Sequence, residues 1–463
     1  MAESNVRTRC PECDQLRTRI GELEAQLAAA RKHSRNSSKP PSSDLVKPPK
    51  DLPRGKNKKR RRGGQKGHPR HERPLFPAEQ ITKTHDHILD SCPDCGGALS
   101  DVEEETRVVQ QVELVEKPWR VDEHRGHAYW CSPCRKLHYA AIPKEVRKAG
   151  LAGPQLTALV AYLKGVCHNS FSTIRKLFRD VLKITISRGQ LAKLVRKVSD
   201  SLKETYEELL AALPSAAQLN VDETGHPDQG QHLWTWCFRA PLFTLFHIDA
   251  SRGSDVLIDV LGQEFNGLLG CDYFSAYRKY MKNCGVQVQF CLAHLIRDVK
   301  FLVEHPDQDN RRYGEMLLDH LRKLFGVIHR RDSFATPKFF QYSLERIRDQ
   351  LVHDAFEQLV DTREAVNLAK RFFEHAESYF RFITEPDIEP TNNLAEQAIR
   401  FVAIHRRMTQ GTRGDTGQRW CERIWTVAAS CLQQGRSVFH FLCAALQAHF
   451  QGQPSPSLLP DTT

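Results

Sequence analysis

Three acidic residues occupy positions at which a metal-dependent phosphoryl-transfer centre could form. Asp222 follows a short β-like run, Gln218–Val221, Asp272 follows a second one, Asn266–Cys271, and Glu396 lies at the start of a helical segment. Transfer of a phosphodiester must stabilise extra charge on the attacking and leaving oxygens, which two magnesium ions about 3.5–4 Å apart can do. Magnesium prefers a few carboxylate oxygens and keeps positions open for water and phosphate. The sequence therefore predicts a catalytic site for magnesium or manganese, with all three acids as ligands.

Glu396 also has a simpler interpretation. Asn393 and Glu396 have the spacing of a capping box, in which the glutamate only closes the N-terminus of a helix. That spacing taken alone favours a structural role, but the placement of Asp222 and Asp272 favours a catalytic one. Arg400, four residues further on, is a candidate DNA contact.

The segments around these acids alternate between strand and helix patterns. Three strands are followed by a helix, a strand, a helix, a strand and a further helix: Gln218–Val221, Leu233–Phe238, Leu242–Ile248, Ser254–Leu261, Asn266–Cys271, Ala276–Met281, Val286–Phe290 and Leu292–Val303. This is the order of the ribonuclease H-like fold, whose first and fourth strands are neighbours, so Asp222 and Asp272 would lie side by side. Glu223 should point to the opposite face of its strand, outside the metal shell.

The long separation between the second and third acids indicates an insertion with helical periodicity. The second half of the chain then consists of a first core segment, a helical insertion, a second core segment and a disordered tail: residues 214–305, 306–385, 386–450 and 451–463. Cys291 and His294 have the CxxH spacing of a metal pair, but the sequence offers only these two ligands. A core cysteine and a helix-facing histidine are the favoured interpretation.

A second metal site is predicted from two CxxC pairs, Cys92 with Cys95 and Cys131 with Cys134. Four thiolates close a tetrahedral zinc site and leave no position for chemistry, so this zinc would be structural. The pairs would belong to a ribbon over residues 85–142, with strands at Thr106–Glu116 and Val121–Ala128. The alternative is two unrelated pairs of buried cysteines.

Residues 150–213 have helical periodicity and a basic helix after Ser187, a favourable N-cap residue. Lys193, Arg196 and Lys197 lie on the outer positions of that helix. Helix, turn and basic helix are typical of a helix-turn-helix DNA reader, although a plain helical bundle explains the same pattern equally well.

The excess positive charge of the chain is confined to its first part. The chain has a net charge of +11, and residues 1–80 hold 20 Lys and Arg against 9 Asp and Glu. Residues 36–80 predict a basic, disordered linker whose cationic arm suits phosphate backbones. Its densest run contains six candidate DNA contacts: Lys56, Lys58, Lys59, Arg60, Arg61 and Arg62.

The first 35 residues predict a short coiled coil. Leu16, Ile20, Leu23 and Leu27 follow heptad spacing, so the chain is expected to form a homo-oligomer, although a lone surface helix fits nearly as well. The sequence contains neither a signal-peptide pattern nor an apolar run of about 20 residues, which predicts a cytoplasmic protein without membrane contacts.

The motifs together resemble those of the insertion sequence 66 family of DDE transposases. The resemblance is carried by four core motifs and by the linker and paired CxxC motifs before them: Val221-Asp222-Glu223-Thr224, Cys271-Asp272-Tyr273 with Ala276-Tyr277, Cys291-Leu-Ala-His294 with Arg297, and Asn392-Asn393-Leu-Ala-Glu396-Gln-Ala-Ile-Arg400. They cover most of the chain in the expected order, which makes their combination more specific than any single motif.

The resemblance implies an α/β multidomain protein. It would have a ribonuclease H-like catalytic core with a helical insertion, preceded by a coiled coil, a zinc ribbon and a helical DNA-binding region. It also implies metal-dependent cleavage at the ends of a mobile element, followed by attack of the freed 3′-hydroxyl on double-stranded target DNA. Accessory proteins of the same element are implied as partners. The alternatives are a ribonuclease H-like nuclease and an inactive, DNA-binding remnant.

Overall fold

The computed structural model describes residues 11–33, 35–37, 74–88, 91, 93–98, 108–112, 115, 118–133, 135–385 and 387–459. The chain divides into two units, a larger one of residues 1–48 and 124–463 and a smaller one of residues 49–123. Within the described part of the chain, no helix is both long and apolar enough to cross a membrane.

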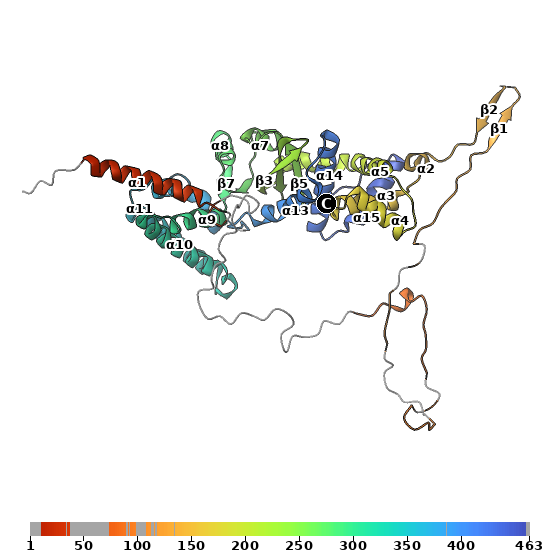
Figure 1. The fold of residues 1–463 in the computed structure, drawn as a ribbon, viewed down its shortest axis with the longest axis horizontal. Helices are drawn as coiled ribbons and strands as arrows, with labels where there is room; N and C mark the ends of the chain where they lie inside the picture. The colour runs from red at the N-terminus through yellow and green to blue at the C-terminus, as the bar shows by residue number, and fades with distance from the viewer. Residues whose placement is uncertain are drawn as a thin grey trace, which may run out of the picture. The chain divides into compact units, whose positions relative to one another are not determined.

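A five-stranded mixed sheet forms the centre of the larger unit (Figure 1). Its spatial order is β5-β4-β3-β6-β7, and its strands are β3 (Gln218–Asp228), β4 (Gln231–Arg239), β5 (Thr244–Asp249), β6 (Leu268–Cys271) and β7 (Gln287–Phe290). The first three strands pair antiparallel through short turns, whereas β6 joins β3, and β7 joins β6, in parallel after helical crossovers. The sequence pattern predicts this alternation of strands and helices.

β3 is longer than the sequence pattern predicts. It continues to Asp228 and pairs along its length with β4 through a tight turn at Gln229 and Gly230, both of which have positive φ (49° and 87°). Asp222 therefore lies inside the strand and not at its end. Pro227 is compatible with this extension because the pairing of β3 with β6 stops at Asn220.

Crossover helices and C-terminal helices accompany the sheet. The crossover helices are α7 (Ser254–Leu261), α8 (Ser275–Cys284) and α9 (Leu292–Val303), and the C-terminal helices are α13 (Asn393–Thr409), α14 (Asp415–Gln433) and α15 (Val438–Gln451).

Polar side chains of α14 occupy the free edge of β5. Three residues at four-residue spacing, Glu422, Thr426 and Ser430, accept hydrogen bonds from alternate backbone N–H groups of β5 at 2.7, 3.0 and 3.0 Å. One turn of helix advances about as far as two strand residues, so the two elements stay in register. The edge strand is thereby covered.

The helical region before the sheet packs on α14 and α15 and shares one hydrophobic core with the sheet. Its elements are α2 (Lys144–Ala149), α3 (Pro154–Ala161), the π-helical η3 (Tyr162–Val166), α4 (Phe171–Asp180), α5 (Arg188–Ser201), α6 (Lys203–Ala212) and η4 (Leu213–Ser215). Ser170 and Ser187 cap α4 and α5 by accepting hydrogen bonds from backbone N–H groups at 3.0 and 3.1 Å.

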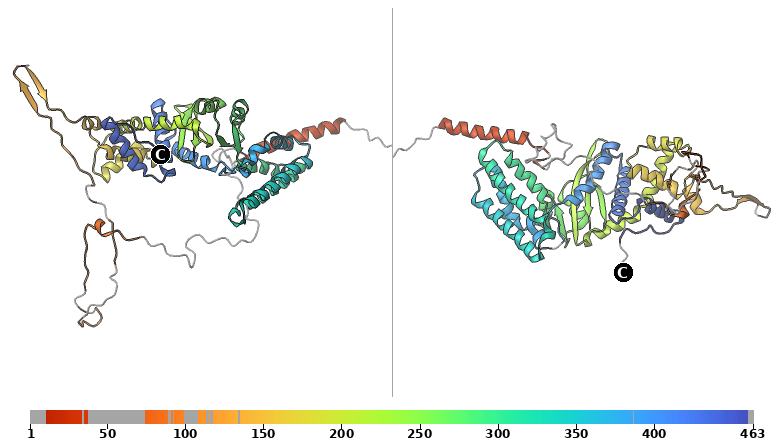
Figure 2. Two further views of the ribbon diagram at one scale, coloured as in Figure 1. Left: turned by 180° about the vertical axis from the view of Figure 1, so that it is seen from behind. Right: turned by 90° about the horizontal axis from the view of Figure 1, so that it is seen from below.

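Between α9 and α13 the chain forms a helical layer, seen apart from the sheet in the right view of Figure 2. It contains α10 (Gln308–Ile328), η5 (Arg331–Ser333), α11 (Pro337–Glu357), α12 (Arg363–Phe380) and η6 (Arg381–Ile383). Tyr313 donates a hydrogen bond to the Ala355 carbonyl at 2.7 Å, and His320 lies 2.8 Å from Asp354, so polar contacts join α10 to α11 inside an apolar interface.

The N-terminal helix α1 (Pro11–Ala30) exposes all four positions of the expected heptad seam, with Leu16 63% and Leu27 44% exposed. The residues that follow attach to α9: Asn36 is buried and donates to Glu304 at 2.7 Å, and the Lys32 ammonium lies over the Phe301 ring. Asn36 and Ser37 are therefore held in place, although the sequence assigns them to a disordered linker.

Residues 455–458 contact the helical region, whereas the sequence predicts a disordered tail over residues 451–463. Leu458 is fully buried. Ser455 donates hydrogen bonds from its backbone N–H to Glu204 and from its hydroxyl to the Ser201 carbonyl, and Ser457 donates to Glu208. Short polar residues can hold an irregular segment in this way, which a composition-based prediction does not detect.

The expected ribbon strands are also placed differently. Within the described residues of Thr106–Glu116 and Val121–Ala128, only Ala128 belongs to a strand. The hairpin instead consists of β1 (Ala128–Cys131) and β2 (Lys136–Tyr139), with Trp130 opposite Leu137. Cross-strand pairing of aromatic and aliphatic residues favours this register.

In the smaller unit, the described residues include η2 (Ala78–Gln80), and Gln110 forms hydrogen bonds with the backbone of Phe76 at 2.6 and 3.0 Å.

Candidate active site

The sheet brings Asp222 and Asp272 together. Asn220 and Gly270 are partners in the parallel β3–β6 pair, and each acid lies two residues beyond its paired residue. Because strand side chains repeat every two residues, both acids leave the sheet on the same face. The Oδ1 atom of Asp272 accepts the Phe274 N–H at 2.9 Å, and that of Asp222 accepts the Glu223 N–H at 3.0 Å, so both carboxylates are oriented by the backbone.

The electrostatics of these two carboxylates are unfavourable for negative charge. Burial raises the pKa of Asp222 well above its usual range, and repulsion from three nearby carboxylates adds to it, those of Glu223, Asp272 and Glu396. Burial and then repulsion from Glu223 raise the pKa of Asp272 from 3.8 to about 7, against the effect of the Phe274 N–H and Arg252. Crowded, desolvated acids of this kind are typical of a site that a cation neutralises.

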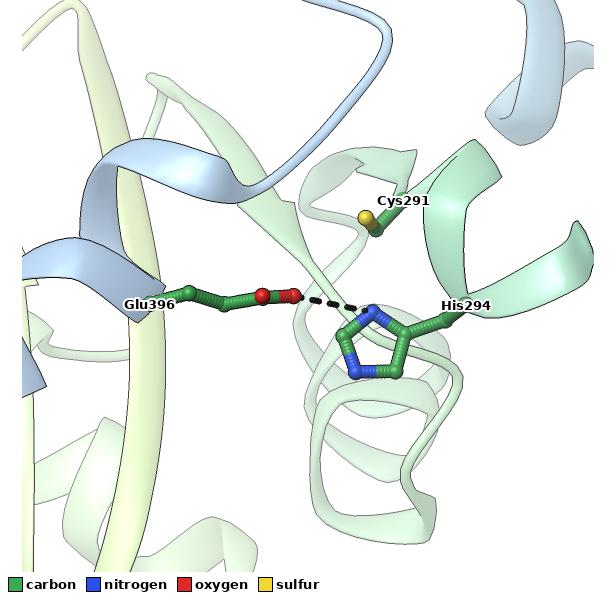
Figure 3. A group of neighbouring side chains, drawn as sticks. All are labelled: Cys291, His294 and Glu396. Carbon is green, nitrogen blue, oxygen red and sulfur yellow. Dashed lines mark ion pairs between the residues drawn. The ribbon is translucent and has the colours of Figure 1, made fainter. Parts of the chain in front are cut away.

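Glu396 lies in the first turn of α13, and its carboxylate faces α9 (Figure 3). Its Oε1 atom lies 3.4 Å from His294 Nδ1 and 3.2 Å from a terminal nitrogen of Arg297. The Glu396 carboxylate repels Asp222 electrostatically. Among the described residues, one group of three side chains has metal-ligand atoms within 4.8 Å of one another, and it consists of Cys291, His294 and Glu396. Glu396 therefore lies near the aspartate pair, but the residues that it contacts directly, His294 and Arg297, belong to α9.

The capping-box interpretation of Glu396 does not agree with the structure. Asn392 is the N-cap residue of α13, and no side chain caps that end. The Asn392 side chain instead bridges to β3, donating to the Val221 carbonyl at 2.8 Å and accepting from Asn220 at 3.0 Å. Gly270 makes room for this link, because a Cβ there would lie 2.5 Å from the Asn220 amide nitrogen.

Asn392 is a positioning residue, a role that its place in the sequence motif did not reveal. It fixes the start of α13 against β3 one residue before Asp222, and its own N–H donates to Cys291 Sγ at 3.1 Å. The sequence shows the paired asparagines but not the partners of Asn392 on β3.

Glu223 lies on the other side of β3 from the aspartate pair. Its Oε1 atom accepts two hydrogen bonds from Arg252, at 3.0 and 2.7 Å, and its Oε2 atom accepts one from the Tyr277 hydroxyl. The Arg252 guanidinium lies 4.5 Å from the Trp234 ring and 3.9 Å from the Phe274 ring. This ion pair, buried only on the Glu223 side, thereby supports the loop whose backbone holds Asp272.

Comparison with known proteins supplies the family. Residues 149–419 match the model of the Transposase IS66 family, which covers more than half of the chain. The chain belongs to the IS66 transposase family. Residues 90–135 match the zinc-finger binding domain of transposase IS66, and residues 5–74 match a family of unknown function.

Two relatives of the IS66-family chain are proteins of Sinorhizobium fredii. It is similar to the uncharacterized protein y4jD, with 24% identity over 68% of this chain and 66% of the relative. It is also similar to the uncharacterized protein y4qI, with 22% identity over 79% of this chain and 72% of the relative. The chain thus spans slightly less than two thirds of the first relative.

The zinc-finger match falls on the two CxxC pairs. Cys92 and Cys134 lie outside the described residues, Cys95 is exposed and Cys131 is half-buried. The residue after each pair is left-handed, Gly96 with φ 72° and Arg135 with φ 50°. That conformation costs a non-glycine residue about 1–2 kcal/mol.

The candidate DNA contacts of the IS66-family chain have different environments. Lys193, Arg196 and Arg400 are exposed, whereas the run from Lys56 to Arg62 lies outside the described residues. Lys197 differs from the expectation: its ammonium donates to the Lys148 and Ala149 carbonyls at 2.6 and 2.8 Å. It therefore caps the C-terminal end of α2 and is committed to the fold.

Proposed function

We propose that this chain is a DNA transposase that cleaves the ends of its element and joins the freed 3′-hydroxyl to target DNA. The observation that carries the proposal is the pairing of Asp222 with Asp272, each two residues beyond a partnered position of neighbouring parallel strands, with raised pKa values. The sheet order with three antiparallel and two parallel strands supports a ribonuclease H-like core.

The donor atoms near the aspartate pair fit magnesium or manganese. Both aspartates offer carboxylate oxygens, and each has one oxygen already held by a backbone N–H, so the ligands are preorganised. Asp222, Asp272 and Glu396 would hold the ions. When bound, divalent ions would polarise the phosphodiester and favour deprotonation of the attacking water or hydroxyl.

The chain itself would position the reacting groups. The Phe274 N–H keeps Asp272 in one orientation, while Asn392 holds α13 and thus Glu396 beside β3. Arg297 offsets the charge of Glu396. Transfer by direct attack of the 3′-hydroxyl requires no covalent protein–DNA intermediate.

DNA would be bound outside this centre. Arg196, Lys193 and Arg400 offer exposed positive charge, and the run from Lys56 to Arg62 would add contacts to phosphates that do not depend on sequence.

The left-handed residues after both CxxC pairs support a structural zinc held by Cys92, Cys95, Cys131 and Cys134. The exposed seam of α1 supports pairing of two chains as a coiled coil, and accessory proteins remain a proposal from the family.

A strand-transfer assay with cognate element ends, target plasmid and magnesium tests the proposal. The parent should cleave and join, Asp272→Asn should bind the ends but do neither, and Asp259→Asn, an exposed position on α7, should match the parent. A parent that cuts without joining would indicate a nuclease. A parent that binds but does not cut would indicate an inactive remnant.

A further inference from the structure

Three side chains from two helices converge next to the aspartate pair. Cys291 is the N-cap residue of α9, His294 lies in the first turn of that helix, and Glu396 lies in the first turn of α13. Their ligand atoms all lie within 4.8 Å of one another, and Figure 3 shows Glu396 and His294 pointing toward each other with Cys291 beside them. The sequence displays only the first two, because the third is 102 residues away from His294 along the chain.

Two of the three atoms are prepared to act as ligands. The Sγ atom of Cys291 accepts the Asn392 N–H at 3.1 Å and sits at a helix N-terminus, although burial raises the pKa of this thiol to about 11, so it is protonated in the metal-free chain. The Nδ1 atom of His294 is buried and makes no hydrogen bond. A buried nitrogen without a hydrogen-bond partner is costly unless a metal ion binds its lone pair.

The spacing fits a small tetrahedral ion. Zinc bonds to nitrogen and oxygen are about 2.0–2.2 Å long, so adjacent ligands of a tetrahedral zinc lie roughly 3.3–3.5 Å apart. The distance from His294 Nδ1 to Glu396 Oε1 is 3.4 Å. A terminal nitrogen of Arg297 lies 3.2 Å from the same oxygen, so the guanidinium has to move off that oxygen when an ion binds there.

We propose that Cys291 Sγ, His294 Nδ1 and a Glu396 carboxylate oxygen bind one zinc-class divalent ion, separate from the zinc of the CxxC pairs. A sulfur, nitrogen and oxygen donor set selects zinc or cobalt over magnesium, which prefers oxygen alone. Three protein ligands leave one position open for a water molecule. Binding releases the thiol proton of Cys291 to solvent, so the ion meets one thiolate and one carboxylate.

Occupancy of this site would hold Glu396 against α9 and away from the aspartate pair. This consequence rests on the proposed function, because it matters only if Glu396 also serves the catalytic ions. Metal binding at the site does not depend on the proposed function and can be measured without DNA.

The test is the zinc content of the purified full-length chain after dialysis against micromolar zinc. The parent should hold one zinc ion more per chain than Cys291→Ser and one more than His294→Ala. Cys284→Ser, a half-buried cysteine at the end of α8, is the matched control and should keep the parental content. Circular dichroism establishes that each variant is folded.

Cobalt substitution supplies a second readout on the parent itself. Cobalt titration of chain already loaded with one zinc should give a further sulfur-to-cobalt charge-transfer band, which His294→Ala should weaken and Cys291→Ser abolish. Equal zinc contents in the parent and both variants, with no further cobalt band, would overturn the proposal and leave the cluster as a support for Glu396 alone. Because neither readout requires DNA, failure here is distinguishable from failure of the strand-transfer assay.

Discussion

Replacement of Asp272 by asparagine should stabilise the metal-free chain above neutral pH. The pKa of Asp272 rises on folding from 3.8 to about 7, so the folded chain binds more protons than the unfolded chain between these values. The stability that Asp272 contributes is therefore present at low pH and falls as the pH rises through that window. Each pKa unit corresponds to about 1.4 kcal/mol, so the ionised site costs up to about 4 kcal/mol.

Asparagine keeps the shape of the side chain and the hydrogen bond from the Phe274 N–H but removes the charge. Asp272→Asn should therefore match the parent near pH 3, exceed it by about 1.6 kcal/mol at pH 5 and exceed it by up to about 4 kcal/mol at pH 8.5. Magnesium should stabilise the parent at pH 8.5 and should stabilise the variant less, because the repulsion that it relieves is gone.

Urea denaturation followed by tryptophan fluorescence measures this difference, because Trp236 in β4 and Trp425 in α14 are buried beside the sheet. Asp259→Asn on the exposed surface of α7 is the control and should track the parent at each of these pH values. A parent–variant difference that is the same at pH 5 and pH 8.5 would refute the reasoning, since charge repulsion at Asp272 would then contribute nothing.

Three further predictions concern the supports of the site and the DNA contacts. Asn392→Ala should lower the free energy of unfolding by about 1–3 kcal/mol for each polar group left unpaired, and the exposed Asn393→Ala should have little effect in the same denaturation assay. Arg196→Ala should weaken DNA binding without loss of stability, whereas Lys197→Ala should lower the free energy of unfolding by about 1–2 kcal/mol with DNA binding unchanged. DNA-binding and melting measurements on both variants check this, and the reverse result would contradict the roles given to Arg196 and Lys197. Deletion of residues 45–70 should flatten the dependence of log affinity on log salt concentration, and an unchanged slope would show that this arm does not contact phosphates.

The local periodicity of the sequence was sufficient to predict the elements of the central sheet. The structure gives α7 (Ser254–Leu261) and α9 (Leu292–Val303) the predicted bounds. Both helices have a one-sided apolar face, and α7 lies between Gly253 and Gly262, so the information is local. The end of β3 was missed because its last residues include glycine, proline and aspartate, which strands usually avoid.

The contacts of the site were less predictable because they join segments far apart in the sequence. Glu396 had the spacing of a capping residue, and only the packing of α13 against α9 turns its carboxylate toward His294 and Arg297. The partners of Asn392 on β3 were hidden for the same reason. Local spacing cannot distinguish a side chain that closes its own helix from one that reaches a neighbouring element.

A metal-specificity switch at Asp272 tests the central claim most directly. Cysteine at this position offers a sulfur ligand, which magnesium rejects and manganese accepts. Asp272→Cys should therefore lose strand transfer in magnesium and regain a measurable part of it in manganese, while the parent works in both. Joining by Asp272→Cys in magnesium at the parental rate would contradict the claim that Asp272 holds the catalytic ion.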